Sequence, residues 1–213
     1  SLVTSGPTLE AIDPVRYLAN RSSGKQGHAI ATALSRLGAA TTLVSGPSHQ
    51  PDPVGVKMVK VETAVQMLDA CESTLPVDVA ILAAAVSDWR VGTAEISKIK
   101  KGSDKKPPAL TLIENPDILA TLSAVGNARP RLVIGFAAET DDVIANATQK
   151  RAKKGCDWIV ANDVKPETGT FGGDANTVHL ITEDGVEDWP TQSKAAVAER
   201  LAERVVETLT ATQ

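Results

Sequence analysis

Residues 1–37 read SLVTSGPTLEAIDPVRYLANRSSGKQGHAIATALSRL, and this stretch decides the fold class of the chain. An apolar strand at Leu2–Val3 runs into a turn-forming cluster and a polar loop, and a helix then begins near Gly24. Small and apolar residues recur along that helix at three- and four-residue spacing, which gives it one packed face, and residues 41–44 form the next strand. This succession of strand, loop, helix and strand predicts a doubly wound, mostly parallel sheet of the α/β class.

The loop inside this unit is long. It spans Ser5 to Ser23, whereas a strand-to-helix connection in such a fold usually takes about 2–6 residues. A helix N-terminus offers unpaired backbone N–H groups and the positive end of the helix dipole, and both suit a phosphate group. We therefore favour anion binding here over a plain surface loop with a capping serine. The polar side chains that the loop carries to the helix start are Arg16, Asn20, Arg21, Ser22, Ser23 and Lys25.

Two familiar phosphate-binding motifs are absent from this stretch. A Walker A loop requires a glycine where the chain has Ala19, and a serine or threonine where it has Gln26. The dinucleotide pattern G-x-G-x-x-G is also missing, because only Gly24 and Gly27 occupy its positions. Neither a P-loop nucleotide hydrolase nor a standard NAD enzyme is well supported.

The composition fits one domain over residues 1–213, with 42% apolar residues to fill its core. A net charge of −4 argues against a general nucleic-acid binder. Cys71 and Cys156 are too few for a disulfide framework, and we expect reduced, buried thiols of a cytoplasmic protein. No apolar run approaches the ~20 residues of a membrane span, so no membrane association is expected. The chain begins in a strand without a methionine, which suggests a part of a longer protein.

Further strands and helices alternate along the chain, as a three-layer, Rossmann-like α/β fold requires. The expected strands are 54–61, 77–86, 131–138 and 157–160. The expected helices are 62–75, a short one from Asn115, 141–154 and one from near Ser193. Residues 165–176 are interpreted as a loop, and 177–182 with 186–189 as an added antiparallel hairpin. The carboxyl ends of parallel strands share one rim of a sheet, which would gather residues 5–6, 85–88, 137–140 and 162–163.

Residues 91–108 contain the strongest charge feature, with five lysines between positions 98 and 106. Such a run is most often a solvated basic loop; a nucleic-acid patch is a further alternative, although the acidic balance and the scarcity of aromatics speak against it. We favour a mobile flap that closes over a triphosphate. Asp88 follows a buried strand at the expected rim, where a carboxylate commonly meets ribose hydroxyls or a magnesium ion.

Other polar residues have ordinary explanations. Asn115 is expected to cap the helix after it, with Pro116 in its first turn. Lys150 and Lys154 lie four residues apart on one helix face, where cations complement the helix dipole in any case. Phe136 is expected in the core rather than stacked on a base. The three histidines show neither metal-binding nor catalytic-triad spacing.

Several linked motifs together resemble a known enzyme family. They are TSGPTLEAIDPVRYLANRSSGKQG, AAAVSDWR, KIKK, ENPDIL, VIGFAAET and ANDV, in this order over nearly the whole chain. The family they closely resemble is the phosphopantothenoylcysteine synthetase domain, which in bacteria is the C-terminal half of a bifunctional coenzyme A biosynthesis protein. The resemblance implies a ligase that joins 4′-phosphopantothenate to L-cysteine through an acyl-cytidylate formed from CTP, with Mg²⁺ carried by the nucleotide. The N-terminal half of such proteins is a flavin-dependent decarboxylase, and FMN is expected there rather than in this domain.

The resemblance also assigns roles to residues. Asn20 matches an asparagine that handles the acyl-cytidylate, Arg16 an arginine linked to the second half-reaction, and Lys98 a flap lysine that engages the triphosphate. Asp88 is in addition a candidate magnesium ligand. The positions that match nucleotide contacts are Ser22, Ala84, Ala85, Asp88, Lys98, Pro116, Asp117, Ile118, Leu119, Phe136, Lys150 and Lys154.

The resemblance further implies a homodimer, with residues 165–190 and edge strands contributing to association, and a larger oligomer when the decarboxylase half is fused. Two other interpretations remain open on the residues alone. One is a different nucleotide-dependent enzyme on the same scaffold, such as an NAD(P)H reductase. The other is a non-catalytic module whose lysines bind a polyanionic partner. A preference for CTP over ATP does not follow from residue types, because it depends on the positions of backbone groups.

Overall fold

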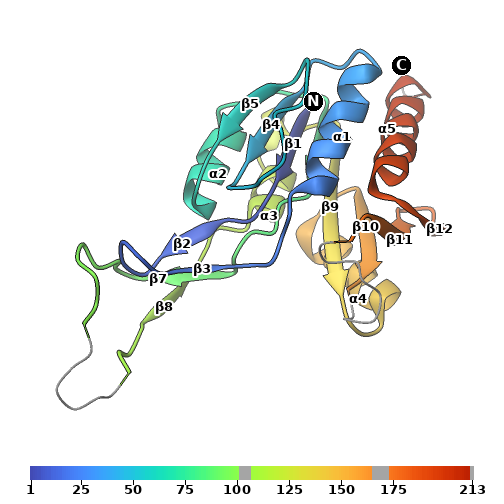
Figure 1. The fold of residues 1–213 in the computed structure, drawn as a ribbon. Coiled ribbons are helices and arrows are strands. Elements are labelled where there is room, and N and C mark those ends of the chain that lie inside the picture. The colour runs from blue at the N-terminus through green and yellow to red at the C-terminus, as the bar shows by residue number, and fades with distance from the viewer. Residues whose placement is uncertain (101–106, 165–172, 212–213) are drawn as a thin grey trace.

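The chain folds around one eight-stranded sheet, and the computed structural model describes residues 1–100, 107–164 and 173–211. Six neighbouring strands are parallel, and a C-terminal hairpin adds two antiparallel strands at one side (Figure 1). In spatial order the strands are β5 (Lys57–Lys60), β4 (Thr42–Ser45), β1 (Leu2–Ser5), β6 (Val79–Leu82), β9 (Leu132–Glu139), β10 (Trp158–Asp163), β11 (Ala175–Ile181) and β12 (Val186–Ser193). The predicted fold class and the added hairpin are confirmed.

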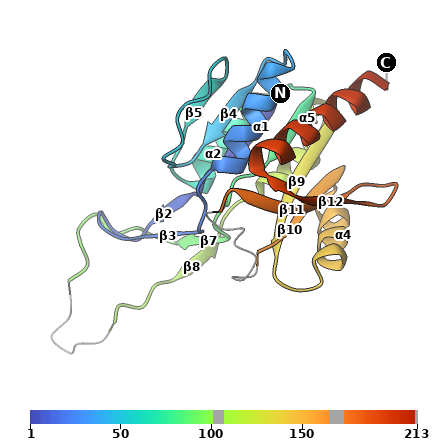
Figure 2. The ribbon, with the colours of Figure 1, turned by 45° about the vertical axis from the view of Figure 1, so that its right-hand side comes forward.

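Helices cover both faces of this sheet and make the fold a three-layer one (Figures 1 and 2). One face carries α1 (Lys25–Arg36) and α5 (Lys194–Ala211); the other carries α2 (Ala64–Glu72), α3 (Ile118–Ser123) and α4 (Val143–Lys154), with a short 3₁₀ helix η1 (Gly126–Ala128) before β9. Successive strand residues point to opposite faces. Val3 accordingly packs with Ile30 and Leu34 of α1, whereas Leu2 packs with Met67 of α2.

Two small strand pairs project from the sheet as an arm, defined here as residues 9–19, 89–100 and 107–114 (Figures 1 and 2). In the arm β2 (Leu9–Ala11) pairs with β3 (Tyr17–Ala19), and β7 (Trp89–Val91) pairs with β8 (Leu112–Glu114). The stretch predicted as a polar loop before α1 contains a hairpin, which was not predicted. A hairpin forms because the Asp13 carboxylate accepts the N–H groups of Val15 and Arg16 and closes the turn. Of the predicted flap, residues 101–106 lie outside the described residues.

Two predicted strands are shorter than the sequence pattern suggested. The run 77–86 is a strand only over β6, because Ala84 N–H donates to the Thr4 hydroxyl and Ala85 pairs with Pro7 in an isolated bridge. The run 54–61 is a strand only over β5, since the chain before it makes a turn. The predicted loop 165–176 falls mostly outside the described residues, and its last two residues belong to β11.

The two cysteines are buried free thiols, as predicted. Burial raises the pKa of Cys71 to about 12 and that of Cys156 to about 11, so neither thiol is ionised near neutral pH. Over the described ranges, no helix combines the length and apolar character that a membrane crossing requires.

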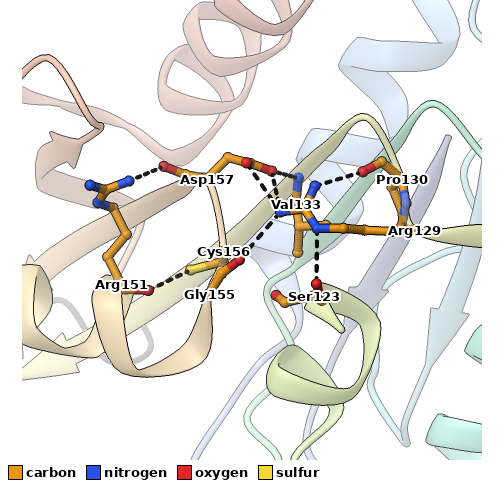
Figure 3. Close-up of polar contacts among 8 residues, drawn as sticks. All are labelled: Ser123, Arg129, Pro130, Val133, Arg151, Gly155, Cys156 and Asp157. Atoms are coloured by element: carbon orange, nitrogen blue, oxygen red, sulfur yellow. Dashed lines mark hydrogen bonds and ion pairs between the residues drawn. The ribbon is translucent and has the colours of Figure 1, made fainter. Parts of the chain in front are cut away.

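Arg129 fastens the helices of one face to the sheet (Figure 3). Its guanidinium donates to the carbonyl oxygens of Ser123 at 2.9 Å and Gly155 at 3.2 Å, and to the Asp157 carboxylate at 3.0 Å. The same carboxylate accepts the Val133 N–H at 2.7 Å. The ends of α3 and α4 are thereby tied to β9 at Val133 and to Asp157, the residue before β10.

Candidate active site

The carboxyl ends of β1 and β6 form the floor of the candidate site. Ala85 N–H donates to the Gly6 carbonyl oxygen at 2.9 Å, which joins the two chain segments past the ends of their strands. Gly6 has a φ of +74°, and a Cβ at Gly46 would overlap the Pro7 carbonyl oxygen, so both positions require glycine. Ala84 and Ala85, predicted to line the site, are half-buried in this close packing of backbone on backbone.

The stretch that leads into α1 returns to this floor. Asn20 Nδ2 donates to the Val86 carbonyl oxygen at 2.9 Å. Ser5 Oγ, at the end of β1, donates to the Gly24 carbonyl oxygen at 2.9 Å, and Ser22 Oγ accepts the Gly24 N–H at 3.3 Å. Gly24 itself occupies the N-cap position, with a φ of +74°, so the capping serine of the alternative interpretation is not found. The N-terminus of α1 therefore lies at the rim, beside Asn20.

The start of α3 is fastened to the same rim, and the predicted role of Asn115 as its cap was wrong. Asn115 N–H donates to the Asp88 carbonyl oxygen at 2.9 Å, and its side-chain amide donates to the Ser87 carbonyl oxygen at 2.8 Å. The N-cap is Asp117, whose carboxylate accepts the Ala120 N–H at 3.0 Å. The proline between them precedes the helix instead of lying in its first turn. The Asp88 side chain is exposed beside this junction.

Two lysines of α4 reach the start of α3. Lys154 Nζ forms an ion pair with the Asp117 carboxylate, and Lys150 Nζ donates to the Phe136 carbonyl oxygen at 3.1 Å. Burial alone would raise the pKa of Asp117, but hydrogen bonds from Lys154 and the Ala120 N–H, with the charges of both lysines, hold it below its ordinary 3.8. Phe136 is half-buried against the core, as predicted. We call these four residues, Asp117, Phe136, Lys150 and Lys154, the cationic corner.

Two further predicted contact residues face the core with their side chains. Ile118 is buried, and Leu119 packs so closely on β9 that a Cβ at Gly135 would lie 2.5 Å from Leu119 Cδ2. What they present toward the rim is backbone of the first turn of α3, where helical N–H groups lack a partner four residues earlier. Pro116 is half-buried just before that turn.

The structure places Arg16 and Lys98 on the arm. Arg16 Nη2 donates to the Asp13 carboxylate at 2.6 Å and to the Ile99 carbonyl oxygen at 2.8 Å, and Lys98 is the exposed residue before Ile99. Arg16 is thus hydrogen-bonded to the residue that follows Lys98. Between described residues, no hydrogen bond or ion pair joins either of them to Asn20 or to the cationic corner. Asp13 was not among the predicted site residues, although its position in an Asp-Pro turn is a signal for side-chain-to-backbone hydrogen bonding.

Other polar groups near α1 have structural partners. Lys25, expected among the cations at the helix start, pairs with Asp174 at 2.7 Å. His28 Nδ1 lies 3.0 Å from Ser5 Oγ and 3.0 Å from the Gly24 carbonyl oxygen, and burial lowers the pKa of its ring. These contacts fit a structural role for His28.

The family of the chain follows from comparison with known proteins. A family model described as "DNA/pantothenate metabolism flavoprotein C-terminal domain" matches residues 1–209. The chain belongs to this family. The coenzyme A biosynthesis bifunctional proteins CoaBC of Vibrio vulnificus (strain YJ016) and Escherichia coli (strain K12) are each 43% identical to this family member, over 205 and 207 residues, with 96% of this chain and 51% of the relative covered.

A solved structure agrees with this family assignment. The crystal structure of the C-terminal domain of a coenzyme A biosynthesis bifunctional protein CoaBC has a TM-score of 0.80 and 38% identity, covering 98% of this chain and 94% of that one. The resemblance noted in the sequence is confirmed. The chain spans about half the length of the curated relatives it matches, at 51%.

Asp88 at the rim was predicted to be a candidate magnesium ligand. Across residues 1–100, 107–164 and 173–211, no group of three or more His, Cys, Asp or Glu side chains is placed to hold a metal. Mg²⁺ commonly keeps its waters and takes one or two carboxylates together with substrate phosphates. The exposed carboxylate of Asp88 fits that mode of binding and does not by itself make a metal site.

Proposed function

We propose that this chain is a CTP-dependent phosphopantothenate–cysteine ligase of coenzyme A biosynthesis. Its products would be 4′-phosphopantothenoyl-L-cysteine, CMP and pyrophosphate, made in the cytoplasm. Relatives that are 43% identical carry the name of a coenzyme A biosynthesis bifunctional protein. The observation that carries the proposal is the rim itself, where the alanine floor, the N-terminus of α1 and the cationic corner meet at the carboxyl ends of parallel strands.

The first half-reaction activates a carboxylate, which is otherwise a poor acyl donor. An oxygen of that carboxylate attacks the α-phosphorus of CTP, the bond to the leaving pyrophosphate breaks, and an acyl-cytidylate forms. Lys98 offsets charge on the triphosphate, while Ser22 and the first turn of α1 bind phosphate oxygens. The cytidine lies at the start of α3, close to the Phe136 carbonyl oxygen, where Lys150 and Lys154 supply positive charge. Magnesium, when bound, offsets triphosphate charge.

The second half-reaction forms the amide. The amine of L-cysteine attacks the acyl carbon, the bond from that carbon to the CMP oxygen breaks, and the amine loses a proton. Asn20 orients the acyl-cytidylate against the floor of Ala84 and Ala85, whose short side chains leave room for it. Arg16 stabilises charge in this step from the arm, and Asp88 stands beside the nucleotide as the carboxylate that could join a magnesium ion.

We also propose a homodimer, and a larger oligomer when the decarboxylase half is attached. Exposed large apolar side chains gather on the arm: Val15, Tyr17, Trp89, Ile96, Leu110, Leu112 and Ile113. Several large apolar side chains exposed on one small arm favour association through it, because exposed apolar surface commonly marks an interaction site. The contribution expected from residues 165–190 stays a prediction. Light scattering of Trp89→Ser should show monomers where the unmodified protein is dimeric; monomers in both would refute the dimer.

A pyrophosphate-release assay tests the activity. We expect release with CTP in the presence of 4′-phosphopantothenate, and little with ATP, GTP or UTP or without the acid. A non-catalytic polyanion-binding module would release none with any nucleotide. A titration with NADPH tests the reductase alternative, since tight NADPH binding without CTP binding would favour it. Lys98→Gln should block pyrophosphate release, and normal release by that variant would count against the assigned role.

A further inference from the structure

The carboxylate of Asp13 lies buried at the centre of the arm. Its side chain is 0% exposed, although the next three residues of the hairpin turn, 14–16, are exposed. Oδ1 accepts the N–H groups of Val15 and Arg16, each at 2.9 Å. Oδ2 accepts Arg16 Nε at 3.0 Å, Arg16 Nη2 at 2.6 Å and the Ile99 N–H at 3.1 Å. One side chain therefore receives five hydrogen bonds, three of them on a single oxygen.

These bonds join two segments that are far apart in the sequence. Ile99, 86 residues from Asp13, donates its N–H to the carboxylate, and its carbonyl oxygen accepts Arg16 Nη2 at 2.8 Å. Glu95 N–H donates to the Ile12 carbonyl oxygen at 2.9 Å, so residues 95–99 lie along the hairpin turn. Both backbone groups of Ile99 therefore form hydrogen bonds with the hairpin turn, and these bonds fix the chain directly after Lys98.

The electrostatics of the contact explain why a carboxylate can occupy this position. A buried carboxylate without partners is strongly unfavourable, whereas hydrogen bonds to its charged form offset that cost. Burial acts to raise the pKa of Asp13, but the N–H groups of Val15, Arg16 and Ile99 and the Arg16 guanidinium together hold it well below its ordinary 3.8. The side chain is therefore ionised, and its charge is balanced by Arg16.

We propose that Asp13 is a positioning residue that holds Arg16 and the Lys98 segment in one arrangement, so that the two cations act on the substrate as a unit. The catalytic part of this inference rests on the proposed ligase function. The link between the two segments is a property of the arm and can be measured without any substrate. Asp13 touches no reacting atom; it acts through the guanidinium of Arg16 and the backbone of Ile99.

Asp13→Asn separates two functions of this side chain, which are closing the hairpin turn and binding Arg16 and Ile99. The remaining amide oxygen can still accept the two N–H groups that close the turn, so the hairpin should persist. The new NH₂ group would face donors from Arg16 and Ile99, so the ties to both should be lost. The matched control is Asp184→Asn, which makes the same chemical change at an exposed turn between β11 and β12.

The first measurement is amide hydrogen exchange of the whole protein over residues 95–100. In Asp13→Asn we expect exchange faster by on the order of tenfold or more, because a hydrogen bond to a charged group is lost and local opening becomes easier. Asp184→Asn should exchange like the unmodified protein. Arg16→Ala keeps the carboxylate for the Ile99 N–H, so its exchange should stay slower than that of Asp13→Asn. Unchanged exchange in Asp13→Asn overturns the proposal.

The second measurement is a double-mutant cycle on kcat/KM for pyrophosphate release and for amide formation. Asp13→Asn should lower both, with kcat falling more than KM rises, and the double variant with Arg16→Ala should be no worse than the poorer single variant. Strictly additive losses would overturn the idea that the cations act as a unit. If the unmodified protein releases no pyrophosphate from any nucleotide, the proposed function fails, while faster exchange still upholds the link within the arm.

Discussion

Replacing Gly27 by alanine should destabilise the fold, although alanine is the better helix former. Gly27 lies in the first turn of α1, directly against β1. A Cβ at this position would lie 2.5 Å from both Cβ and Oγ of Ser5, and 2.9 Å from the Thr4 carbonyl oxygen. Such contacts are too short to persist, so either the helix or the strand has to move.

The expected cost combines three effects. Overpacking a close contact costs roughly 1–3 kcal/mol. Ser5 cannot turn away without loss, because its Oγ donates to the Gly24 carbonyl oxygen at 2.9 Å and lies 3.0 Å from His28 Nδ1, and a hydrogen bond is worth about 1 kcal/mol. The gain in helix propensity from glycine to alanine is at most about 1 kcal/mol. The net loss is about 2 kcal/mol, or roughly 4–8 °C in Tm for a domain of this size.

Urea unfolding followed by circular dichroism measures this change, and the double variant Gly27→Ala with Ser5→Gly tests its cause. Removing the Ser5 side chain makes room for the new Cβ, so the double variant should be more stable than the sum of the two single changes predicts. Gly27→Ala at or above the stability of the unmodified protein, or strictly additive losses, would refute the close-contact argument.

Three further substitutions test the cationic corner, the link that Arg129 makes between helices and sheet, and the arm. Lys154→Gln should raise the KM for CTP about tenfold through loss of a charge contact, while Lys153→Gln, exposed on the same helical turn, should not; equal effects in steady-state kinetics would contradict the corner. Arg129→Ala should lower the free energy of unfolding by about 2 kcal/mol, by urea titration, with kcat nearly unchanged. Asp13 and Asp117 have pKa values below the ordinary 3.8 in the folded state, so each ionised carboxylate stabilises the fold above pH 3.8. This contribution is lost as the pH falls from 3.8 through the pKa that each group has in the folded protein. Thermal unfolding between pH 5 and 2 should therefore show less acid sensitivity in Asp13→Asn.

The pattern of apolar residues predicted the strands of the sheet, because neighbouring residues largely determine where a strand forms. A run such as RLVIGFAA is typical of a strand buried on both faces, and β9 forms there. Strand ends were less predictable, since β6 stops where the Thr4 hydroxyl takes the Ala84 N–H, a contact that no periodicity encodes. The start of α3 shows the same limit. Asn115 and Asp117 are both good caps, and contacts with the loop after β6 decide which one caps.

The rim of the candidate site could be anticipated from topology, whereas its charge pairs could not. Parallel strands place their carboxyl ends together, so the floor and Asp88 were expected there. The ion pair of Lys154 with Asp117 spans 37 residues, and the bond between Asp13 and Ile99 spans 86. Such pairs depend on how helices and hairpins dock, and this is set by packing across the whole domain.

The arm is rooted in the candidate site through two of its strands, β3 and β7. β3 is followed directly by Asn20, whose amide binds the Val86 carbonyl oxygen at 2.9 Å, and β7 begins directly after Asp88. Any shift of the arm should therefore also move Asn20 and Asp88, two predicted site residues.

Asn20→Asp tests the consequence of this rooting for catalysis. The substitution replaces the Nδ2 donor by an oxygen that faces the Val86 carbonyl oxygen, so it should loosen the root of the arm as well as disturb the acyl-cytidylate. We expect pyrophosphate release to persist, amide formation to slow by at least tenfold, and the intermediate to accumulate in rapid-quench experiments. Hydrogen exchange over residues 95–100 then distinguishes two causes of the slower amide formation. Unchanged exchange assigns the defect to contact with the intermediate, faster exchange assigns it to the position of the arm, and unchanged amide formation refutes both.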